Sequence, residues 1–299
     1  MKKLFALLLT LAMVLSLAAC GGKKEEAPAE APAAPPAEAP AAPEAPAEPE
    51  APALETVTAG KLTVATSPDF APYEFYAIAE DGTPSLAGFD MDLAQYIADY
   101  LGLELEVVPM DFDGVLMELA NGSVDLGLAG LSPDPARMDA MSFSDIYYAG
   151  GQSFVTIKAN ADKFPDLASA NTAGISVAAQ IGSIQMDLAN EFSADTDIVP
   201  LPKVTDILAE LIAGKLDGAY IETAVAQSYQ VNYPDLHIVC DVPYDVEGSA
   251  VGVIKGNDAL LSGVNEAIAA ALADGSMDAF VAEANELAAG NIHEGLLEG

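Results

Sequence analysis

The sequence predicts an α/β protein built in two lobes around parallel-rich sheets. Segments of strand composition and segments of helical periodicity alternate from Lys61 onward, and this βαβ rhythm is typical of parallel sheets. A helix-end pattern occurs twice, as Glu118–Asp125 and as Glu210–Asp217, so that each half contains one such unit. The pattern fits either an internal duplication or two ordinary helix-to-strand junctions. Apolar residues make up 52% of the chain, enough for two packed cores.

Composition and stop signals predict the individual elements. Lys61–Thr66 has the composition of a strand. Asp90–Leu101 has helical periodicity, and we expect Asp90 to cap this helix and Gly102 to end it. A further helix is expected over Asp113–Ala120. The other segments with strand composition are Leu103–Val108, Val124–Ala129 and Asp217–Ile221.

The charge of the chain excludes one class of partner. Its 299 residues contain 46 Asp and Glu against 11 Lys and Arg, a formal net charge of −35. A polyanion repels the phosphates of nucleic acids, so we expect no nucleic acid partner. Only 2 Cys and 2 His are present. We therefore expect neither a disulfide framework nor a metal site, and no cofactor.

The N-terminus has the features of a secretory signal. Lys2 and Lys3 precede the apolar run Leu4–Leu17, and small residues follow it. Leu17-Ala-Ala-Cys20 resembles the bacterial lipobox, and this resemblance implies cleavage before Cys20 and lipidation of its thiol and new amino group. The alternative is an ordinary secreted protein with a chance cysteine. The second cysteine, Cys240, is expected to be a small buried apolar residue.

A low-complexity segment separates this signal from the body of the chain. From Glu25 to Leu54, 29 of 30 residues are Ala, Pro or Glu. Proline every three or four residues prevents a stable helix, and no large apolar side chain is available for a core. We expect an extended, negatively charged tether that holds the body at a membrane surface.

Six segments of the body carry a resemblance to a known family. They are Gly60–Val64, Ser67–Phe75, Gly88–Ala94, Asp111–Gly114, Asp134–Arg137 and Phe143–Tyr148. In this order they resemble the motifs of the solute-binding lipoproteins of polar amino acid ABC transporters, family 3. The resemblance extends from about Gly60 to Asn285. It implies a two-lobed clamp of the type II periplasmic-binding-protein kind, with two crossover strands as its hinge.

The resemblance also implies how the chain is divided and where it works. The crossings would fall near Gly150–Gln152 and Pro243–Ser249. The expected divisions are a signal peptide over 1–19, a lipid anchor and linker over 20–55, lobe 1 over 56–150 and 247–299, and lobe 2 over 151–246. We expect a monomer outside the cytoplasm that is attached to the bacterial cell membrane only through its lipid. It would deliver a free amino acid to the permease of an ABC transporter.

Two charged residues are expected to hold the ends of the amino acid. Arg137 is the sole arginine of the chain, and its guanidinium fork matches a carboxylate as lysine does not. We expect it in the first turn of a helix capped by Asp134, and the family motif implies that it binds the α-carboxylate. The alternative is a surface ion pair. The resemblance implies that Glu222 binds the α-ammonium; alternatively, it only favours the N-terminus of its helix.

Polar groups from both lobes are expected to complete the head-group site. The resemblance implies that Gly130 offers a backbone carbonyl to the ammonium and that Ser132 offers its hydroxyl and N–H. Ser183, Ile184 and Gln185 match a second-lobe segment in which a helix N-terminus donates N–H groups to the carboxylate. This chain has Ile184 where the family usually has a hydroxyl residue, so one side-chain hydrogen bond is lost.

The side-chain pocket is expected to be more apolar than charged. Phe70 and Phe112 match aromatic positions that stack on the ligand, although both could instead be core residues. Ser67 stands where relatives that select cationic side chains commonly have an acid. With Ala129 and Ile184, these residues favour a neutral amino acid over Lys, Arg or His. A preference for Arg or Lys would instead point to Asp69 or Asp111 as an acid of the pocket.

Two other functions remain open at the level of sequence. The cyclohexadienyl dehydratases resemble this family and use the cleft for acid catalysis, with Glu222 as the obvious proton donor here. A lipid tether has little purpose in such a soluble enzyme, so we expect no enzymatic activity. The second alternative is a sensory module that presents amino acids to a membrane receptor.

Overall fold

The computed structural model describes residues 54–79, 81–246 and 248–291. Its first large sheet has the strand order β5-β1-β6-β13-β7. The neighbours of β1 run parallel to it, whereas β13 runs antiparallel to both β6 and β7. The strands are β1 (Lys61–Thr66), β5 (Glu104–Pro109), β6 (Leu126–Gly127), β7 (Met141–Tyr148) and β13 (Ser249–Ile254).

A second sheet repeats this plan with the order β10-β9-β11-β8-β12. Here β9 is parallel to both of its neighbours, and β8 is antiparallel to β11 and β12. The strands are β8 (Gln152–Ile157), β9 (Ser176–Gln180), β10 (Asp197–Leu201), β11 (Gly218–Glu222) and β12 (Leu236–Val242). A small antiparallel sheet contains β2 (Asp69–Phe70), β3 (Glu74–Ile78) and β4 (Pro84–Ala87).

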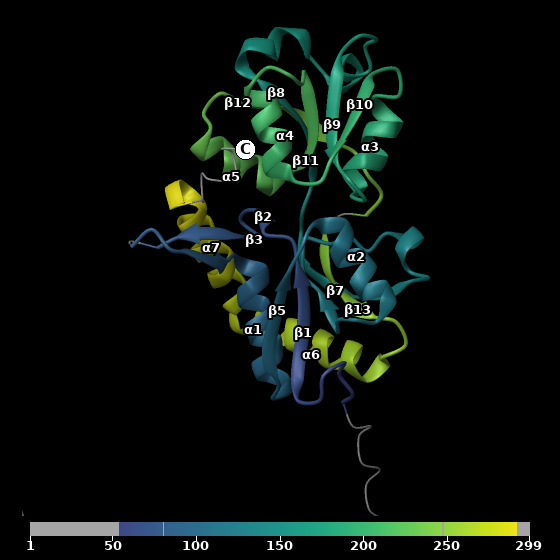
Figure 1. Ribbon diagram of the computed structural model, residues 1–299, viewed down its shortest axis with the longest axis vertical. Helices are drawn as coiled ribbons and strands as arrows, with labels where there is room; N and C mark the ends of the chain where they lie inside the picture. Colours follow the sequence, from purple (N-terminus) through teal and green to yellow (C-terminus); the bar gives the residue numbers. More distant parts are fainter. Residues whose placement is uncertain (1–53, 80, 247, 292–299) are drawn as a thin grey trace, which may run out of the picture. The chain divides into compact units, whose positions relative to one another are not determined.

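Helices pack on both large sheets (Figure 1). We call the first large sheet, the small sheet and their helices the first lobe; its α-helices are α1 (Phe89–Leu101), α2 (Phe112–Asn121), α6 (Asp258–Asp274) and α7 (Ser276–Asn291). The second sheet and its helices form the second lobe, with α3 (Ile184–Phe192), α4 (Val204–Ile212) and α5 (Thr223–Asn232). The 3₁₀ helices are η1 (Pro135–Arg137), η2 (Lys158–Lys163) and η3 (Leu167–Ala170).

The chain passes between the two large sheets twice. It leaves the first sheet after Tyr148 and enters the second at Gln152. It leaves the second sheet after Val242 and rejoins the first at Ser249. Each large sheet therefore consists of strands that are continuous in sequence except for β13, which returns to the first lobe. This topology is the two-lobed α/β fold with two crossover segments that the sequence predicted.

Most expected elements are present, and the structure corrects some of their details. Helix α1 ends at Gly102 as expected (φ 68°), but Gly88 and not Asp90 is its N-cap residue. Gly88 has a φ of 121°, and a Cβ there would lie 2.1 Å from the carbonyl oxygen of Tyr73, so only glycine fits. Asp90 lies inside the first turn and is fully buried. The segment Val124–Ala129 pairs as a strand only over β6, because the flanking residues meet β1 through isolated hydrogen bonds.

The repeated helix-end pattern has the same hydrogen bonds in both lobes. The N–H of Asp125 donates to the carbonyl of Thr63 (2.9 Å), and the N–H of Thr63 donates back to the Asp125 carboxylate (2.8 Å). Asp217 and Ser176 exchange the same pair of bonds at 2.8 and 3.1 Å. In each lobe the aspartate fixes the start of one parallel strand against the next.

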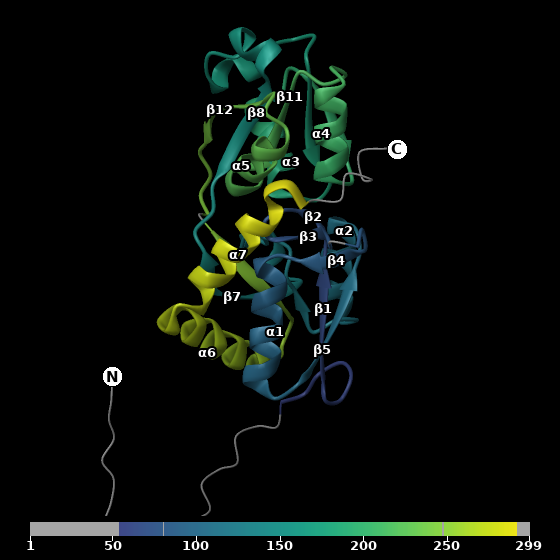
Figure 2. The same cartoon turned by 90° about the vertical axis from the view of Figure 1, so that its left-hand side faces the viewer.

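The last helix connects the two lobes. Figure 2 shows α7 running alongside α1, with its end beneath α5 of the second lobe. Asn232, at the end of α5, donates to the carbonyl of Ala288 (3.0 Å) and accepts from the N–H of Gly290 (2.9 Å). The amide of Asn232 therefore satisfies backbone groups where α7 ends.

Several expectations concern features at the level of the whole chain. Cys20 and the linker lie outside the described residues. Cys240 is half-buried in β12, not fully buried, and it packs against the core of the second lobe. Within the described residues, no helix combines the length and the apolarity needed to cross a bilayer. The same residues contain no cluster of His, Cys, Asp or Glu arranged to bind a metal ion.

Candidate ligand-binding site

Arg137 lies where the first lobe meets the second. It is the last residue of the single 3₁₀ turn η1, not part of an α-helix, although Asp134 caps the turn by accepting from the N–H of Ala136. Its Nη2 donates to the carbonyl of Gly182 in the second lobe (2.9 Å), and its Nη1 donates to the carbonyl of Ser132 (3.4 Å). Burial lowers the pKa of Arg137. None of the ion pairs between described residues includes this guanidinium, so the surface ion pair left open by the sequence is not formed.

Phe112 supports this guanidinium from the first lobe. Phe112 is the first residue of α2 and is 7% exposed. The centroid of its ring lies 5.8 Å from the guanidinium carbon of Arg137. A cation over an aromatic face at this distance is attracted by the quadrupole of the ring. The charges of Asp134 and Asp187 also act on the guanidinium, but no carboxylate among the described residues forms an ion pair with it.

Glu222 is the corresponding charged residue of the second lobe. It ends β11, is 3% exposed and caps α5 by accepting from the N–H of Val225 (2.8 Å). A second N–H, from Gly151 in the first crossover, donates to its other oxygen (3.3 Å). Burial raises the pKa of Glu222 to about 7, against the lowering effect of these hydrogen bonds. The carboxylate both caps its helix and occupies the hinge, so the two roles left open by the sequence are not exclusive.

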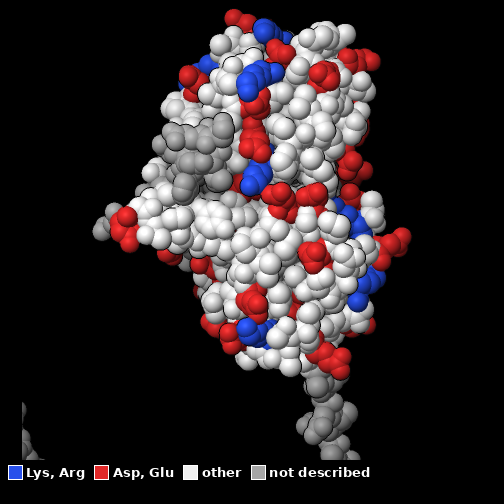
Figure 3. All heavy atoms as spheres, in the orientation of Figure 1, with Lys and Arg blue, Asp and Glu red and all other residues white. Residues whose placement is uncertain are grey.

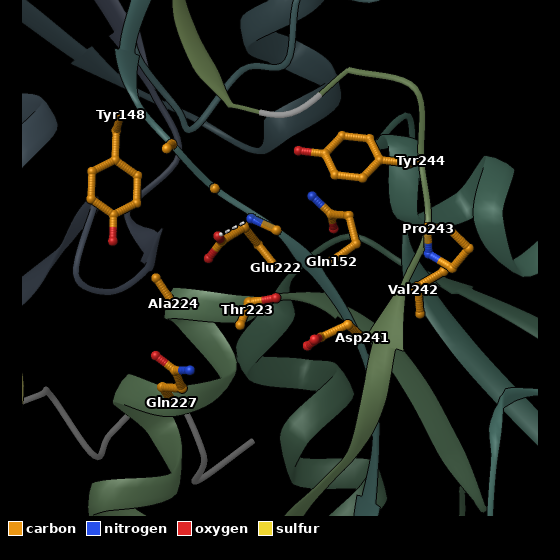
Figure 4. Close-up of a pocket in the computed structure, with 13 residues that line it drawn as sticks. Tyr148, Gln152, Glu222, Thr223, Ala224, Gln227, Asp241, Val242, Pro243 and Tyr244 are labelled. Atoms are coloured by element: carbon orange, nitrogen blue, oxygen red, sulfur yellow. Dashed lines mark hydrogen bonds between the residues drawn. The ribbon is translucent and has the colours of Figure 1, made fainter.

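A cavity of about 650 Å³ lies beside Glu222. The two crossover segments and the start of α5 form its walls, and Figure 4 shows Tyr148 and Tyr244 on opposite sides of the glutamate. Gln152, Gln227 and Asp241 add polar groups to the lining, which contains no lysine or arginine. Arg137 does not line this cavity.

Gly130 lies against the ring of Phe70 in the first lobe. Gly130 has a φ of 56°, and a Cβ there would lie 2.7 Å from the ring of Phe70. The Phe70 ring is 7% exposed and packs 5.3 Å from the ring of Tyr73, which is fully buried beneath it. Ser132 is 6% exposed, two residues further along the same loop.

The second-lobe segment forms the expected helix N-terminus. Ser183 is the N-cap of α3 and accepts from the N–H of Met186 (3.3 Å), while its hydroxyl donates to the carbonyl of Gln180 (2.7 Å). Ile184 is the first residue of that helix and is partly buried. Gln185 is buried and donates to the side chain of Gln152 (2.8 Å), at the start of β8.

Ser67 has a partner that sequence reasoning missed. Its hydroxyl donates to Asp69 Oδ1 (2.8 Å), and both side chains are almost completely buried. They line a cavity of about 180 Å³ together with Tyr76, with residues just before α2 that include Asp111, and with Lys203 of the second lobe. The neutral side chain of Ser67 thus has a buried carboxylate beside it. The signal available in the sequence was Asp69 itself, an acid that follows Pro68 and precedes the aromatic residue Phe70.

A buried acid pair beneath Gly130 was also missed. Asp90 accepts from the N–H of Gly130 (3.0 Å) and from the hydroxyl of Tyr147 (2.7 Å). Glu74 is fully buried, and no N–H or O–H donor reaches either of its carboxylate oxygens. It lies within hydrogen-bonding reach of Asp90, and burial raises its pKa well above the usual range. A protonated Glu74 can therefore donate to Asp90, which in turn holds the loop that begins at Gly130.

With this geometry established, the comparisons with known proteins identify the family. The family of bacterial extracellular solute-binding proteins, family 3, matches residues 62–284. The chain belongs to this family. The predicted resemblance is therefore confirmed over most of the body of the protein.

Individual relatives show the range of functions on this fold. The chain is 32% identical over 203 residues to the arginine-binding extracellular protein ArtP of Bacillus subtilis, covering 66% of this chain and 76% of ArtP. A structure of the amino acid ABC transporter substrate-binding protein AbpA of Streptococcus pneumoniae, bound to L-arginine, superposes with a TM-score of 0.73 at 32% identity. That match covers 77% of this chain and 96% of the other. Cyclohexadienyl dehydratase of Pseudomonas aeruginosa is 27% identical over 60% of this chain and 65% of its own length.

Proposed function

We propose that this solute-binding protein binds a free α-amino acid between its lobes and delivers it to an ABC importer. The observation that carries the proposal is the partly buried Arg137 guanidinium, which faces the second lobe without a carboxylate partner among the described residues. Glu222 is a buried acid of the second lobe that has backbone donors and no cation beside it. A zwitterion supplies the two missing opposite charges in one molecule.

We propose that the other predicted contacts complete the site around these two groups. Arg137 would take the α-carboxylate in a bidentate pair, assisted by Ser132 and by the α3 N-terminus at Ser183, Ile184 and Gln185. Glu222 and the Gly130 carbonyl would take the ammonium. Both lobes then contact one ligand, so the ligand favours a closed conformation over an open one.

The division of the chain follows from this mechanism. The proposed lobes are residues 56–150 with 247–299 and residues 151–246, and the hinge is the pair of crossover segments. Residues 1–19 would be removed as a signal peptide, and Cys20 would carry the lipid that anchors the monomer outside the cytoplasm. Residues 20–55 would then link the anchor to the body. Cys20→Ala cannot carry this lipid. In a partitioning assay, the variant should therefore move from the detergent phase to the aqueous phase.

For the ligand side chain, we infer a neutral amino acid from the residues that the sequence predicts to contact it. Ser67, Phe70, Phe112 and Ile184 contribute no net charge, and the two rings are nearly buried, at 7% exposure each. An apolar or aromatic side chain would bury its surface against them.

One observation favours a cationic amino acid as a second candidate. ArtP is named as an arginine-binding protein, and the AbpA structure contains bound L-arginine. The buried Asp69 carboxylate lies one hydrogen bond from Ser67 in this chain, so it could take the place of an acid at position 67. The two candidates differ in whether Asp69 meets the ligand.

A thermal-shift screen against the twenty amino acids tests the function and separates the two candidates. A ligand at about 100 times its Kd stabilises the native state by roughly 2.7 kcal/mol, which raises Tm by roughly 5–10 °C for a body of this size. A neutral amino acid giving the largest shift supports the first candidate, and Arg or Lys supports the second. No shift with any amino acid would contradict the function. Incubation with prephenate or arogenate, followed by product analysis, tests the dehydratase alternative.

A further inference from the structure

Asp69 receives hydrogen bonds from three separate elements of the opposite lobe. It belongs to β2 in the first lobe and is 4% exposed. Its Oδ2 accepts from the backbone N–H of Val204, at the start of α4, and from Nε2 of Gln180, at the end of β9 (3.3 Å). Its backbone carbonyl accepts from the hydroxyl of Tyr229 in α5 (3.1 Å).

Helix α4 depends on this contact for its N-terminus. Its own N-cap residue, Lys203, makes no side-chain capping bond. The first N–H groups of a helix have no partner within the helix, and an anion beside them is favoured by the helix dipole. The carboxylate of the other lobe supplies both the acceptor and the negative charge, which requires the lobes to be in contact.

The other groups around the carboxylate keep it in place. Oδ1 accepts from Ser67 (2.8 Å), and Gln180 also donates to the carbonyl of Pro202 (3.1 Å), which holds its amide beside α4. Burial raises the pKa of Asp69 to about 6, while its hydrogen bonds with Ser67 and Val204 lower it. The carboxylate form therefore prevails at pH 7.5.

We infer that Asp69 is a positioning residue that latches the two lobes in the closed conformation by capping α4 of the second lobe from the first. It acts on the closing equilibrium and not through contact with the ligand. The inference extends the proposed function, because the closed conformation is the one that would hold an amino acid. A residue that shifts only the closing equilibrium changes the affinity for every ligand by the same factor.

The first arm of the test measures closure without any ligand, so it is independent of the proposed function. Spin labels at Met117→Cys in α2 and Glu191→Cys in α3 report the distance between lobes, with Cys20 and Cys240 changed to serine. Both label sites are exposed. We expect a closed population in the ligand-free chain that Asp69→Ala strongly reduces. No closed population, or one unchanged by Asp69→Ala, would overturn the latch.

The second arm separates a latch from a ligand contact. Calorimetry with one neutral and one cationic amino acid should show both affinities falling by the same factor, at least about tenfold, in Asp69→Ala. A loss confined to the cationic amino acid would overturn the latch and make Asp69 a specificity residue. Asp113→Asn is the matched control, since this exposed acid of the first lobe also lies near the second lobe at Gly182, and its affinity should change less than twofold.

A third variant removes the donor instead of the acceptor. Val204→Pro removes the backbone N–H that donates a hydrogen bond to Asp69. Proline is well tolerated as the first residue of a helix. Lys203 already has the extended conformation (φ −128°, ψ 144°) that a residue before proline adopts. Val204→Pro should weaken binding in the wild type and cost little more in the Asp69→Ala background. Equal losses in both backgrounds would show that the two groups do not act together.

Discussion

Arg137 and Glu222 are charged groups that have lost much of their water without gaining a partner of opposite charge. Neither takes part in an ion pair among the described residues, and burial shifts the pKa of each toward its neutral form. Such groups cost free energy unless something compensates their charge. In a binding protein, the ligand is the natural source of that compensation.

From the raised pKa of Glu222 we predict that ligand binding depends on pH. Its pKa is about 7 in this ligand-free conformation, whereas an ammonium beside it would stabilise the carboxylate and lower that pKa. Binding below about pH 7 therefore releases a proton, and the affinity should fall as the pH drops through 7, by at most about tenfold per unit. Above that value the affinity should level off. Calorimetry between pH 5.5 and 8.5 measures this profile.

The matched variant is Glu222→Gln, which keeps the size of the side chain and removes the titration. Its affinity should be weaker at pH 8 and nearly independent of pH over the same range. Calorimetry in two buffers of different ionisation enthalpy should detect proton release at pH 6 in the wild type only. A flat wild-type profile would show that Glu222 does not bind the ammonium.

At the scale of elements, Asp125 and Asp217 each fix the start of one parallel strand against the next, but their carboxylates differ in burial. The Asp125 carboxylate is fully buried and accepts from the N–H groups of Thr63 (2.8 Å) and Val57 (2.7 Å). Asp217 is partly exposed and shares its carboxylate between the N–H of Ser176 and the ammonium of Lys163 (3.4 Å).

This difference predicts unequal costs for the same substitution. Asp125→Asn leaves one buried N–H facing an amide group, so it should lower the free energy of unfolding by about 1–3 kcal/mol. Asp217→Asn should cost less, since water reaches that site and an exposed ion pair contributes little. Urea denaturation of both variants measures the difference. A larger loss in Asp217→Asn would contradict the ranking.

Strand β3 begins with Glu74, which forms the buried acid pair with Asp90 of α1. Glu74 is fully buried and its pKa is raised well above 4.5, mainly by loss of solvent and then by the charge of Asp90. Between pH 4.5 and that raised pKa, the folded state holds a proton that the unfolded state has lost. As the pH rises through this range, Glu74 should therefore lower the free energy of unfolding by about 1.4 kcal/mol per pH unit.

Glu74→Gln removes this pH dependence while its amide can still donate to Asp90. The variant should have a smaller loss of Tm than the wild type between pH 5 and pH 8, and a higher Tm at pH 8. Glu191→Gln, at an exposed position in α3, is the control and should follow the wild type. Parallel curves for Glu74→Gln and the wild type would show that Glu74 is ionised in the fold.

Sequence reasoning succeeded where the signal was local. Helix α1 ends at Gly102 and strand β1 spans Lys61–Thr66 as expected, because stop residues and side-chain composition act over a few positions. Asp69 and Asp90 were missed or misassigned because their partners are distant in sequence. Val204 is 135 residues from Asp69, and Gly130 is 40 residues from Asp90.

The candidate site shows the same limit. The family motifs located Arg137 and Glu222, and the structure adds what each faces: a second-lobe carbonyl at Gly182 and a crossover N–H at Gly151. The expected helix capped by Asp134 is present as a single 3₁₀ turn that ends at Arg137. A cap and a proline can start either kind of helix, so the sequence did not distinguish them. Which groups end up without a charged partner depends on the tertiary contacts and could not be derived from motifs.

At the scale of the whole molecule, the two crossover segments and several side-chain contacts join the lobes. These contacts include the hydrogen bonds to Asp69, the bonds of Asn232 to the end of α7, and the ion pair between Lys203 and Asp111 (3.7 Å). The surface is acidic: Figure 3 shows Asp and Glu side chains spread over the visible face, with Lys and Arg also present. Like charges repel at low ionic strength, and salt screens this repulsion.

Closure around a ligand should change the dimensions of the protein. Small-angle scattering should give a smaller radius of gyration with a saturating amino acid than without one, because a ligand that contacts both lobes shifts the population to the closed form. Asp69→Ala should have a larger radius than the wild type in the absence of ligand. An unchanged radius at proven saturation would exclude large closure.

The most direct test of the central claim is a calorimetric titration of the amino acid found by screening into the wild type, Arg137→Ala and Arg137→Lys. Removing one partner of a desolvated charge pair costs on the order of 2–5 kcal/mol, so Arg137→Ala should bind at least roughly 30-fold more weakly. Arg137→Lys should restore binding only in part, because an ammonium lacks the fork. Lys215→Ala, at an exposed lysine paired with Glu210 (2.7 Å), should bind like the wild type. Wild-type affinity in Arg137→Ala would contradict an amino acid held by its carboxylate between the lobes.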